Sequence, residues 1–237
     1  MKYAVDLHIH SALSPCADND MTPNNIIGMA LIKGLDIIAI TDHNSAENLE
    51  AFEYCSKGTD LVFVPGMELE TREEIHLICL FPTVQAALNM QNVAYTHMPL
   101  FKNREEIFGE QLILTWEDSI QSHLDRLLLT AADISLEDAV KYAYENGGIA
   151  IPAHIDRSSF SVISSLGRVP EETGFKFLEI SRNCNLNNII NENDYLKNYN
   201  FIRSSDAHTL GDIFERESFL DLEEKSVRCL INALRGK

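Results

Sequence analysis

The sequence predicts an α/β fold in which one domain, residues 1–237, is built on a barrel or a large parallel sheet. Seven short apolar runs are typical of strands, and helical stretches lie between most of them. Strands and helices in alternation favour right-handed βαβ units and a parallel sheet. A chain of 237 residues with 45% hydrophobic residues can bury one large core, and α/β barrels of this size are commonly single domains.

Local signals place the individual elements. The expected strands cover residues 3–8, 36–41, 61–66, 75–81, 148–153, 177–181 and 200–204, and the expected helices cover 23–33, 46–57, 83–94, 136–146 and 223–235. Thr22-Pro23 and Ser135 are typical helix starts, because a hydroxyl can cap the first turn and proline fits the first helical position. Gly34 and Gly147 stand where helices should end.

Residues 95–133 are the least regular part of the chain. They mix acidic residues such as Glu105 and Glu110 with apolar ones such as Phe108 and Trp116. We expect a mostly helical insertion between strands, and an ordinary amphipathic helix pair is favoured over a lid or an oligomer contact.

Composition narrows the partners and the compartment. With 36 acidic and 19 basic residues the net charge is -17, so long duplex DNA is not an expected partner unless bound ions make one pocket positive. Five scattered cysteines without a CxxC pair favour neither a disulfide framework nor a thiolate zinc site, and they suit a reducing compartment. No apolar stretch approaches the roughly 18 residues that span a bilayer. We expect an unprocessed cytoplasmic protein with no membrane partner.

The first strand ends in two histidines with metal-binding spacing. Because successive side chains of a strand alternate between faces, His8 and His10 project to the same side and can hold one ion. Further histidines and carboxylates follow at or just beyond later apolar runs, and in a parallel barrel the carboxyl ends of the strands meet at one rim. The full set is His8, His10, Asp42, His43, Glu68, His76, His154, Asp206 and His208.

This set of residues predicts a multinuclear metal site. Imidazole and carboxylate ligands suit Zn, Mn or Fe better than Ca, and the set is too large for one ion. A single buried histidine is more often a hydrogen-bonded core residue, but a whole set of buried ionisable groups without ions would cost several kcal/mol. Asp6 and Asp42 are expected to orient histidines rather than to bind metal directly.

At this point the chain resembles the PHP superfamily, named for polymerase and histidinol phosphatase domains. The resemblance rests on motifs that occur in family order between residues 6 and 208, namely Asp6-Leu7-His8-Ile9-His10-Ser11, Thr41-Asp42-His43-Asn44, Pro65-Gly66-Met67-Glu68, His76, Pro152-Ala153-His154 and Ser205-Asp206-Ala207-His208. The resemblance implies a distorted seven-stranded (β/α)7 barrel, in agreement with the seven apolar runs.

The resemblance also implies an assignment of ligands to two or three divalent ions. The first ion would be held by His8, His10, Glu68 and Asp206, and Glu68 would bridge to a second ion held by His76 and His154. His43 and His208 would hold a third ion with one more ligand from the segment after His10. For that ligand Asp18 fits the family spacing best, and Cys16 and Asp20 are alternatives.

Such a centre predicts a metal-dependent phosphoesterase. A metal-activated hydroxide would attack a small phosphorylated substrate, such as a nucleotide, a short oligonucleotide or a phosphorylated metabolite. Glu68 would order two ions, Asp206 would bind metal and accept a proton, and Arg157 would bind the phosphate. The alternatives are an amidohydrolase that cleaves C–N bonds, whose family often bridges its metals with a carboxylated lysine, and a non-catalytic PHP module that binds metal for stability or to hold a partner.

Overall fold

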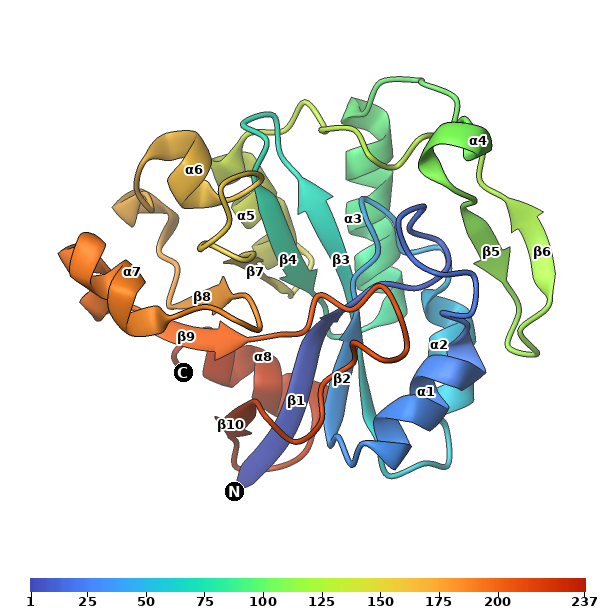
Figure 1. Cartoon of the computed structure of the whole chain (residues 1–237), viewed down its shortest axis with the longest axis horizontal. Coiled ribbons are helices and arrows are strands. Elements are labelled where there is room, and N and C mark those ends of the chain that lie inside the picture. The colour runs from blue at the N-terminus through green and yellow to red at the C-terminus, as the bar shows by residue number, and fades with distance from the viewer.

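The fold centres on a six-stranded sheet. A computed structural model describes all residues 1–237. The strand order is β10 (Phe219–Asp221), β1 (Lys2–Ile9), β2 (Ile37–Ile40), β3 (Val62–Glu70), β4 (His76–Leu80) and β7 (Ile149–Pro152) (Figure 1). Five of these strands coincide with predicted apolar runs, and the short edge strand β10 was not predicted.

The sheet is mixed, so the expectation of a parallel sheet was wrong. Strands β1, β2 and β3 run parallel, whereas β4 is antiparallel to β3, β7 is antiparallel to β4, and β10 is antiparallel to β1. The reason lies in the link of residues 71–75 between β3 and β4, because a parallel connection needs a crossover of a dozen or more residues. The β3–β4 pair is therefore a hairpin.

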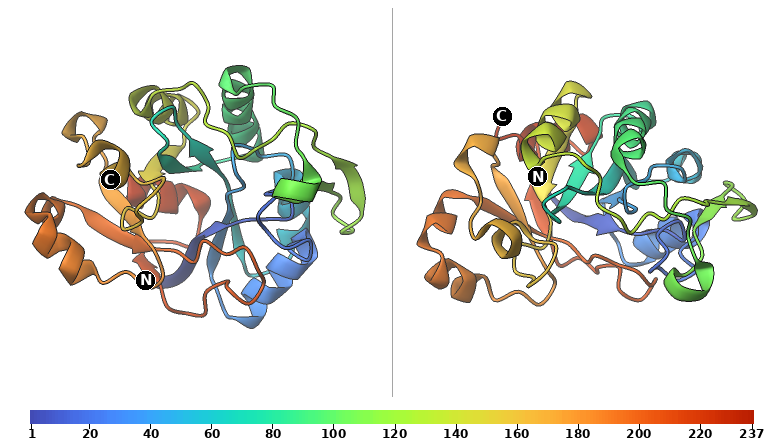
Figure 2. Two further views of the ribbon diagram at one scale, coloured as in Figure 1. Left: turned by 45° about the horizontal axis from the view of Figure 1, so that its top comes forward. Right: turned by 90° about the horizontal axis from the view of Figure 1, so that it is seen from above.

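Two further strands continue the curve of the sheet into a distorted barrel. Strand β8 (Phe177–Ile180) lies beside β7 and pairs in parallel with β9 (Asn200–Arg203). Past β9 the chain returns to β1, where Ile9 and Ala207 form an isolated parallel bridge. All seven predicted strands thus follow one another around a strongly curled sheet (Figure 2). The structure confirms the predicted α/β fold of the distorted seven-stranded type.

Helices cover both faces of the sheet. All five predicted helices are present, as α1 (Pro23–Ile32), α2 (Leu49–Ser56), α3 (Val84–His97), α5 (Leu136–Glu145) and α8 (Val227–Leu234). The Ser135 hydroxyl accepts from the Asp138 N–H and caps α5, while α1 relies on proline in its first turn and has no side-chain cap. No helix combines the length and apolar character needed to cross a membrane.

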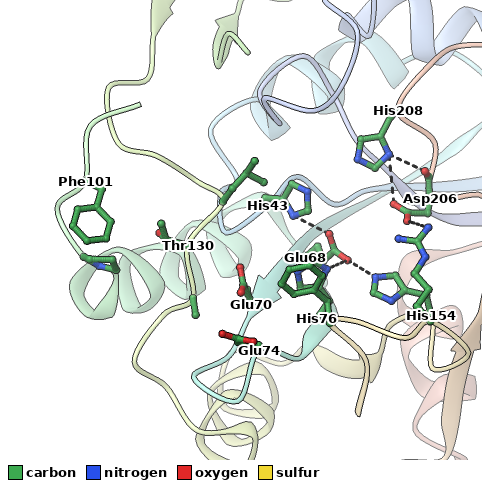
Figure 3. Close-up of a pocket in the computed structure, with 15 residues that line it drawn as sticks. His43, Glu68, Glu70, Glu74, His76, Phe101, Thr130, His154, Asp206 and His208 are labelled. Atoms are coloured by element: carbon green, nitrogen blue, oxygen red, sulfur yellow. Dashed lines mark hydrogen bonds and ion pairs between the residues drawn. The ribbon is translucent and has the colours of Figure 1, made fainter. Parts of the chain in front are cut away.

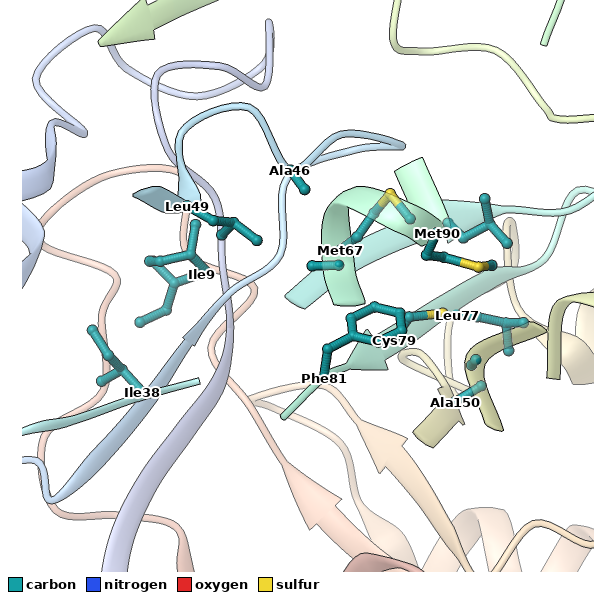
Figure 4. Close-up of a cluster of buried hydrophobic side chains, with 14 of the residues drawn as sticks. Ile9, Ile38, Ala46, Leu49, Met67, Leu77, Cys79, Phe81, Met90 and Ala150 are labelled. Atoms are coloured by element: carbon teal, nitrogen blue, oxygen red, sulfur yellow. The ribbon is translucent and has the colours of Figure 1, made fainter. Parts of the chain in front are cut away.

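The core has two layers because strand side chains alternate between the faces. Ile38 and Met67 belong to the larger apolar cluster, which extends to the helices on one face (Figure 4). Ile37 belongs to a second cluster, which includes Leu230 and Leu234 of α8 on the other face. Both faces of the central strands are therefore covered, which explains why their sequences are nearly continuous apolar runs.

The chain contains several short elements that the sequence did not predict. They lie mainly between β7 and β9: α6 (Val162–Leu166), η1 (Glu171–Thr173), α7 (Leu186–Glu192) and η2 (Asp194–Asn198). In Figure 1 they form the side of the molecule that lies opposite β5 and β6. Helices of one or two turns carry too little periodicity to be recognised from one sequence.

Residues 95–133 were expected to be mostly helical, and this expectation was wrong. After the end of α3 they form the four-residue α4 (Glu105–Phe108) and an antiparallel pair, β5 (Leu112–Leu114) and β6 (Ile120–His123). Leu112 and Leu114 are buried and Ile113 is less so, which is the two-residue period of a strand. Asp118 has a positive φ of 60° in the turn between the strands, as acidic and amide residues often do.

Candidate metal centre

Glu68 is the centre of a buried cluster of histidines (Figure 3). Its side chain is 1% exposed, and β3 holds it within the hydrogen-bonded ladder opposite Ile78 of β4. Five imidazole nitrogens surround its two carboxylate oxygens, at 2.8 Å for His76, 2.9 Å for His43, 3.2 Å for His154, 3.3 Å for His8 and 3.4 Å for His10. The structure therefore brings these six predicted residues together.

The mixed sheet explains how distant segments meet at Glu68. His10, His43, His154 and Asp206 follow β1, β2, β7 and β9, whose ends share one rim. His76 begins β4, contrary to the expectation that every ligand stands at the carboxyl end of a strand, and it reaches the same rim because β4 runs antiparallel to β3. Glu68 departs from that expectation as well, since it lies inside β3.

The imidazoles of His8 and His10 direct the same ring nitrogen into the centre. Nδ1 of His8 faces Glu179 at 3.0 Å, and Nδ1 of His10 faces the Ser14 hydroxyl at 2.9 Å. Their Nε2 atoms lie 3.1 Å apart, and each is 3.2 Å from Oδ1 of Asp206. Carboxylate and imidazole acceptors that converge in this way need protons or a cation between them.

The electrostatics of the cluster favour a cation. Burial alone would raise the pKa of Glu68, but the imidazoles of His76, His8 and His43 hold it well below its usual range. The pKa of Asp206 is likewise lowered, because His8 and His10 outweigh its burial. Glu68 Oε2 is buried and accepts no hydrogen bond. Two ionised carboxylates among imidazoles, one of them with an unsatisfied oxygen, fit a multinuclear metal site.

Asp6 and Asp42 lie behind the cluster and fix the chain around it. Asp42 accepts hydrogen bonds from the Ser11 and Ser14 hydroxyls, at 2.6 and 2.7 Å, and the Ser14 hydroxyl in turn faces His10. Asp6 accepts from the backbone N–H groups of Ser205 and Phe214, both at 3.0 Å. Asp42 therefore positions an imidazole, and Asp6 anchors the loop that carries Asp206.

Glu179 is part of the site and was missed by the sequence analysis. It lies on β8, is 3% exposed, and accepts hydrogen bonds from His8 Nδ1 and from the backbone N–H of His154. The available signal was a single carboxylate inside the apolar run Phe-Leu-Glu-Ile, because an unpaired charge is rarely buried in a strand.

A third group of ligand atoms lies beside the first two. Nitrogens of His10, His43 and His208 lie within 4.8 Å of one another. The imidazoles of His208 and His43 lower the pKa of the Cys16 thiol to about 7, although burial opposes its ionisation. The three candidates for the remaining ligand, the favoured Asp18 and the alternatives Cys16 and Asp20, are all exposed, and none belongs to a group of close ligand atoms.

A cavity of about 580 Å³ opens onto the centre. Figure 3 shows Phe101 and Thr130 on the wall that faces His154 and Asp206, with Glu70 and Glu74 between. Arg157 also lines the cavity. Its Nη2 lies 2.6 Å from Oδ2 of Asp206, and its side chain is 47% exposed. Arg157 is therefore the arginine that reaches both the cluster and open space.

Arg203 at the end of β9 and Arg182 just after β8 have structural roles. Arg203 donates to the carbonyl oxygens of Ser181, Arg182 and Cys184. Arg182 donates to the Asp212 carbonyl oxygen at 2.7 Å. Neither lines the cavity at the centre.

Backbone strain is concentrated around the cavity. His154 and Phe160 have φ values of 28° and 55°, a region that residues other than glycine, asparagine and aspartate seldom adopt. Phe160 stacks on the His76 ring with centroids 4.8 Å apart, and its carbonyl oxygen accepts from the His76 N–H. Strain of this kind persists where the surrounding structure holds residues in a functional geometry.

Sequence comparison finds relatives that share part of the chain. An uncharacterized protein of Methanocaldococcus jannaschii is 30% identical over 89 residues, 38% of this chain and 11% of its own length. A 5'-3' exoribonuclease of Haemophilus influenzae is 28% identical over 78 residues, 32% of this chain and 27% of its own. The chain thus aligns with only a small part of either relative.

Solved structures share the fold at low sequence identity. The lesion-specific endonuclease PfuEndoQ from Pyrococcus furiosus matches all of this chain and 56% of its own, with a TM-score of 0.73 and 18% identity. An amidohydrolase from Chromobacterium violaceum, solved with bound sulfate and without metal, matches 98% of this chain and 96% of its own, with a TM-score of 0.62 and 18% identity.

The family itself is established by a direct match to its sequence model. The model of the PHP domain matches residues 6–149, more than half of the chain, and this range holds Glu68 with the four imidazoles of His8, His10, His43 and His76. The curled mixed sheet and the buried histidine cluster agree with that match. The chain is a member of the PHP domain family.

Proposed function

We propose that this protein is a metal-dependent phosphoesterase that hydrolyses a small phosphorylated substrate, with a nucleotide or short oligonucleotide as the favoured class. The observation that carries the proposal is Glu68, a buried carboxylate between five imidazoles, next to Asp206 and open to a cavity. This donor set fits two or three divalent ions, as expected for a family member with its metal-binding residues in place.

The chain's residues divide among the ions by position. His8, His10 and Glu68 form one group of close ligand atoms, and His43, Glu68 and His76 form another. Asp206 lies 3.2 Å from His8 and His10, and His154 lies 3.2 Å from Glu68. When bound, the ions would supply an activated water and neutralise charge on the phosphate oxygens. Because its pKa is lowered, Asp206 serves mainly as a ligand, and it can take the proton of the attacking water only transiently.

Arg157 is the proposed phosphate-binding residue. Its guanidinium already contacts Asp206 and lines the cavity, so a phosphate held there would lie beside the metal ligands. Guanidinium groups match pairs of phosphate oxygens and keep their charge at all relevant pH values. Arg157 would therefore orient the phosphorus towards the centre.

The cavity suits an organic group larger than phosphate alone. Phe101 and Phe160 offer aromatic surface, and Glu70 and Glu74 offer acceptors for sugar hydroxyls or base amino groups. An aromatic face with acceptors beside it supports a nucleotide, and so does the relative that is an exoribonuclease. The net charge of -17 disfavours long duplex DNA, although an endonuclease of similar fold has been solved with a 27-mer duplex.

A substrate panel with defined metals tests the proposal. Protein freed of metal and reloaded with Mn, Zn or Fe(II) would be given an aryl phosphate, nucleotides, short single strands, sugar phosphates, histidinol phosphate and a 27-mer duplex. We expect phosphate or nucleotide release from the small compounds and from short single strands, and little from the duplex. Turnover of the duplex alone would contradict the substrate class, and no hydrolysis of any phosphoester with any metal would contradict the enzyme proposal.

A C–N hydrolase is the second candidate, because a similar fold is found in an amidohydrolase. In many such enzymes a carboxylated lysine bridges the metals, whereas no lysine lines this cavity and Glu68 occupies the central position. Small amides and lactones in the same panel would separate the two reactions. Cleavage of an amide without any phosphoester turnover would favour the second candidate.

A further inference from the structure

Glu70 is a buried carboxylate in the cavity wall that the proposed hydrolysis does not use. It ends β3 two residues after Glu68, so the two side chains project to the same face of the sheet, roughly 7 Å apart along the strand. Glu70 is 9% exposed and lines the cavity, but it belongs to none of the groups of close ligand atoms. Its carboxylate forms no hydrogen bond or ion pair (Figure 3).

The backbone of Glu70, in contrast, is held on both sides. Its N–H donates to Oδ1 of Asn44, and its carbonyl oxygen accepts from the Ala132 N–H, both at 2.9 Å. The Asn44 amide in turn donates to the carbonyl oxygens of Leu128 and Thr130, at 2.8 and 3.1 Å. These contacts tie the end of β3 to the segment that forms one wall of the cavity, so the carboxylate is positioned before a ligand binds.

The protein supplies no donor for the Glu70 carboxylate. Arg157 is the only lysine or arginine that lines the cavity, and its guanidinium contacts Asp206 at 2.6 Å. The Thr130 hydroxyl on the opposite wall donates to the Leu127 carbonyl oxygen at 3.2 Å. A buried carboxylate without a donor is unfavourable, and a ligand that brings N–H or O–H groups to this wall would remove the cost.

The aromatic residues of the cavity indicate which kind of donor this ligand carries. Phe101 and Phe160 both line the cavity and are 60% and 43% exposed. Figure 3 shows Glu70 between Phe101 and the metal-binding side chains. A flat ring can stack on an aromatic side chain while the N–H groups in its plane reach an acceptor at its edge. Sugar hydroxyls would satisfy the carboxylate but leave the aromatic surface uncovered.

We propose that Glu70 binds the base of the substrate and that guanine is the preferred base. This inference rests on the proposed hydrolysis of a nucleotide and deepens it by naming the base. A carboxylate offers two acceptor oxygens in one plane, and guanine presents two adjacent donors, N1–H and the 2-amino group, on one edge. Hypoxanthine lacks the 2-amino group, and unsubstituted purine lacks both donors. The three bases therefore form a series with two, one and no donors on one ring system.

Competition against an aryl phosphate tests this series. The metal-loaded protein would hydrolyse the aryl phosphate in the presence of the 5'-monophosphate of guanosine, inosine or purine riboside, with ribose 5-phosphate as the compound without a base. Each compound competes whether or not it is hydrolysed, and equilibrium dialysis would measure binding if the aryl phosphate is not turned over. We expect each lost N–H donor to weaken binding about 10-fold or more, because its partner is a charged group.

Variants of Glu70 show whether the carboxylate causes the preference. Glu70→Gln keeps the shape but only one acceptor, so guanosine and inosine monophosphates should bind about equally, while both bind more tightly than the purine compound. Glu70→Leu removes both acceptors and should leave the three compounds within about 3-fold of one another. Glu192→Gln, which changes an exposed carboxylate on α7, should keep the whole series. Circular dichroism would check that each variant is folded.

The results distinguish this inference from the proposed function. Equal binding of the three nucleotides by the parent protein would overturn the inference, as would a series that persists in Glu70→Leu. Tighter binding of ribose 5-phosphate or phosphoethanolamine than of any nucleotide would also overturn it, while a phosphoesterase of another substrate class would stand. A protein that binds guanosine monophosphate in the expected order but hydrolyses no phosphoester would support the inference and contradict the proposed reaction.

Discussion

Glu179 holds His8 from behind, with its Oε2 atom 3.0 Å from Nδ1 of the ring. The hydrogen bond leaves Nε2 free to face Glu68 and Asp206. A carboxylate that takes the N–H of a metal-binding imidazole fixes both the tautomer and the ring orientation and makes the other nitrogen a better ligand. This hydrogen bond connects β8 to β1, which belong to different sheets.

Loss of the charge at residue 179 should weaken metal binding. Glu179→Gln keeps the size of the side chain and can still accept a hydrogen bond from His8, but it no longer stabilises positive charge on the ring. We expect metal affinity to fall about 10- to 100-fold, measured by competition with a chelator. The exposed residue Glu192 on α7 provides the control, since Glu192→Gln should leave the affinity unchanged. Equal affinities in both variants would show that Glu179 does not tune the ligand.

Replacement of Glu68 should abolish most activity with little effect on the fold. Glu68→Gln is isosteric, but it removes the charge that five imidazoles face. We expect turnover to fall by at least about 100-fold and bound metal to decrease, while circular dichroism is unchanged. Turnover that matches the parent protein would refute the central role of this carboxylate.

Arg157 should contribute mainly to substrate binding. Arg157→Met removes the guanidinium but keeps most of the side-chain length, and a lost charged hydrogen bond costs about 1.5–3 kcal/mol, or roughly 10- to 100-fold in KM. Steady-state kinetics on the best phosphate ester would measure the effect. Arg168, which pairs with Glu171 on the surface, is the control, and Arg168→Met should leave KM unchanged. If KM is unaffected in Arg157→Met, the phosphate binds elsewhere.

Metal affinity should decrease as the pH is lowered. Burial would lower the pKa of His8 and His43, but Glu179 and Asp206 raise that of His8, and Glu68 raises that of His43, in both cases well above the usual value. The metal-free rings therefore keep a proton at neutral pH, and an ion must displace it. Calorimetric titrations of the metal-free protein with a divalent metal ion, in two buffers of different ionisation enthalpy, should give different heats of binding. Identical heats would show that no proton leaves on binding.

Gly148 should be intolerant of even a methyl group. A Cβ at this position would overlap the Leu80 carbonyl oxygen and lie 2.6 Å from the Phe81 ring. We expect Gly148→Ala to reduce the free energy of unfolding by about 1–3 kcal/mol, measured from urea titrations. Gly28 on α1 has no atom within 4 Å of its Cβ position, so Gly28→Ala should not destabilise the protein. A similar loss in both variants would exclude close packing as the cause.

The sequence was sufficient for most of the fold because buried strands are short, apolar and bounded by clear signals. The direction of β4 could not be predicted from periodicity, since a strand has the same pattern in either direction, although the short link after Glu70 favours a hairpin. Residues 112–114 were interpreted as helical because an apolar run of three residues fits either structure.

The ligands that stand on or directly after strands could be predicted from the sequence. The ligands that depend on the path of a loop could not. His8 and His10 are fixed by the alternation of one strand. Cys16 and Asp18 lie in the same loop and both are exposed, and the path of this loop depends on the packing of Pro15 against Gly109. Long-range contacts of this kind leave no local pattern.

The location of Glu68 inside a strand has a mechanical consequence. Its backbone is tied to β4 on one side and bridged to His43 on the other, so its carboxylate can move little without breaking the sheet. His154, Asp206 and His208 stand on connecting segments, which can shift by fractions of an ångström more easily. Exchange of ions or departure of product would therefore proceed by movement of these outer groups around a stationary anchor.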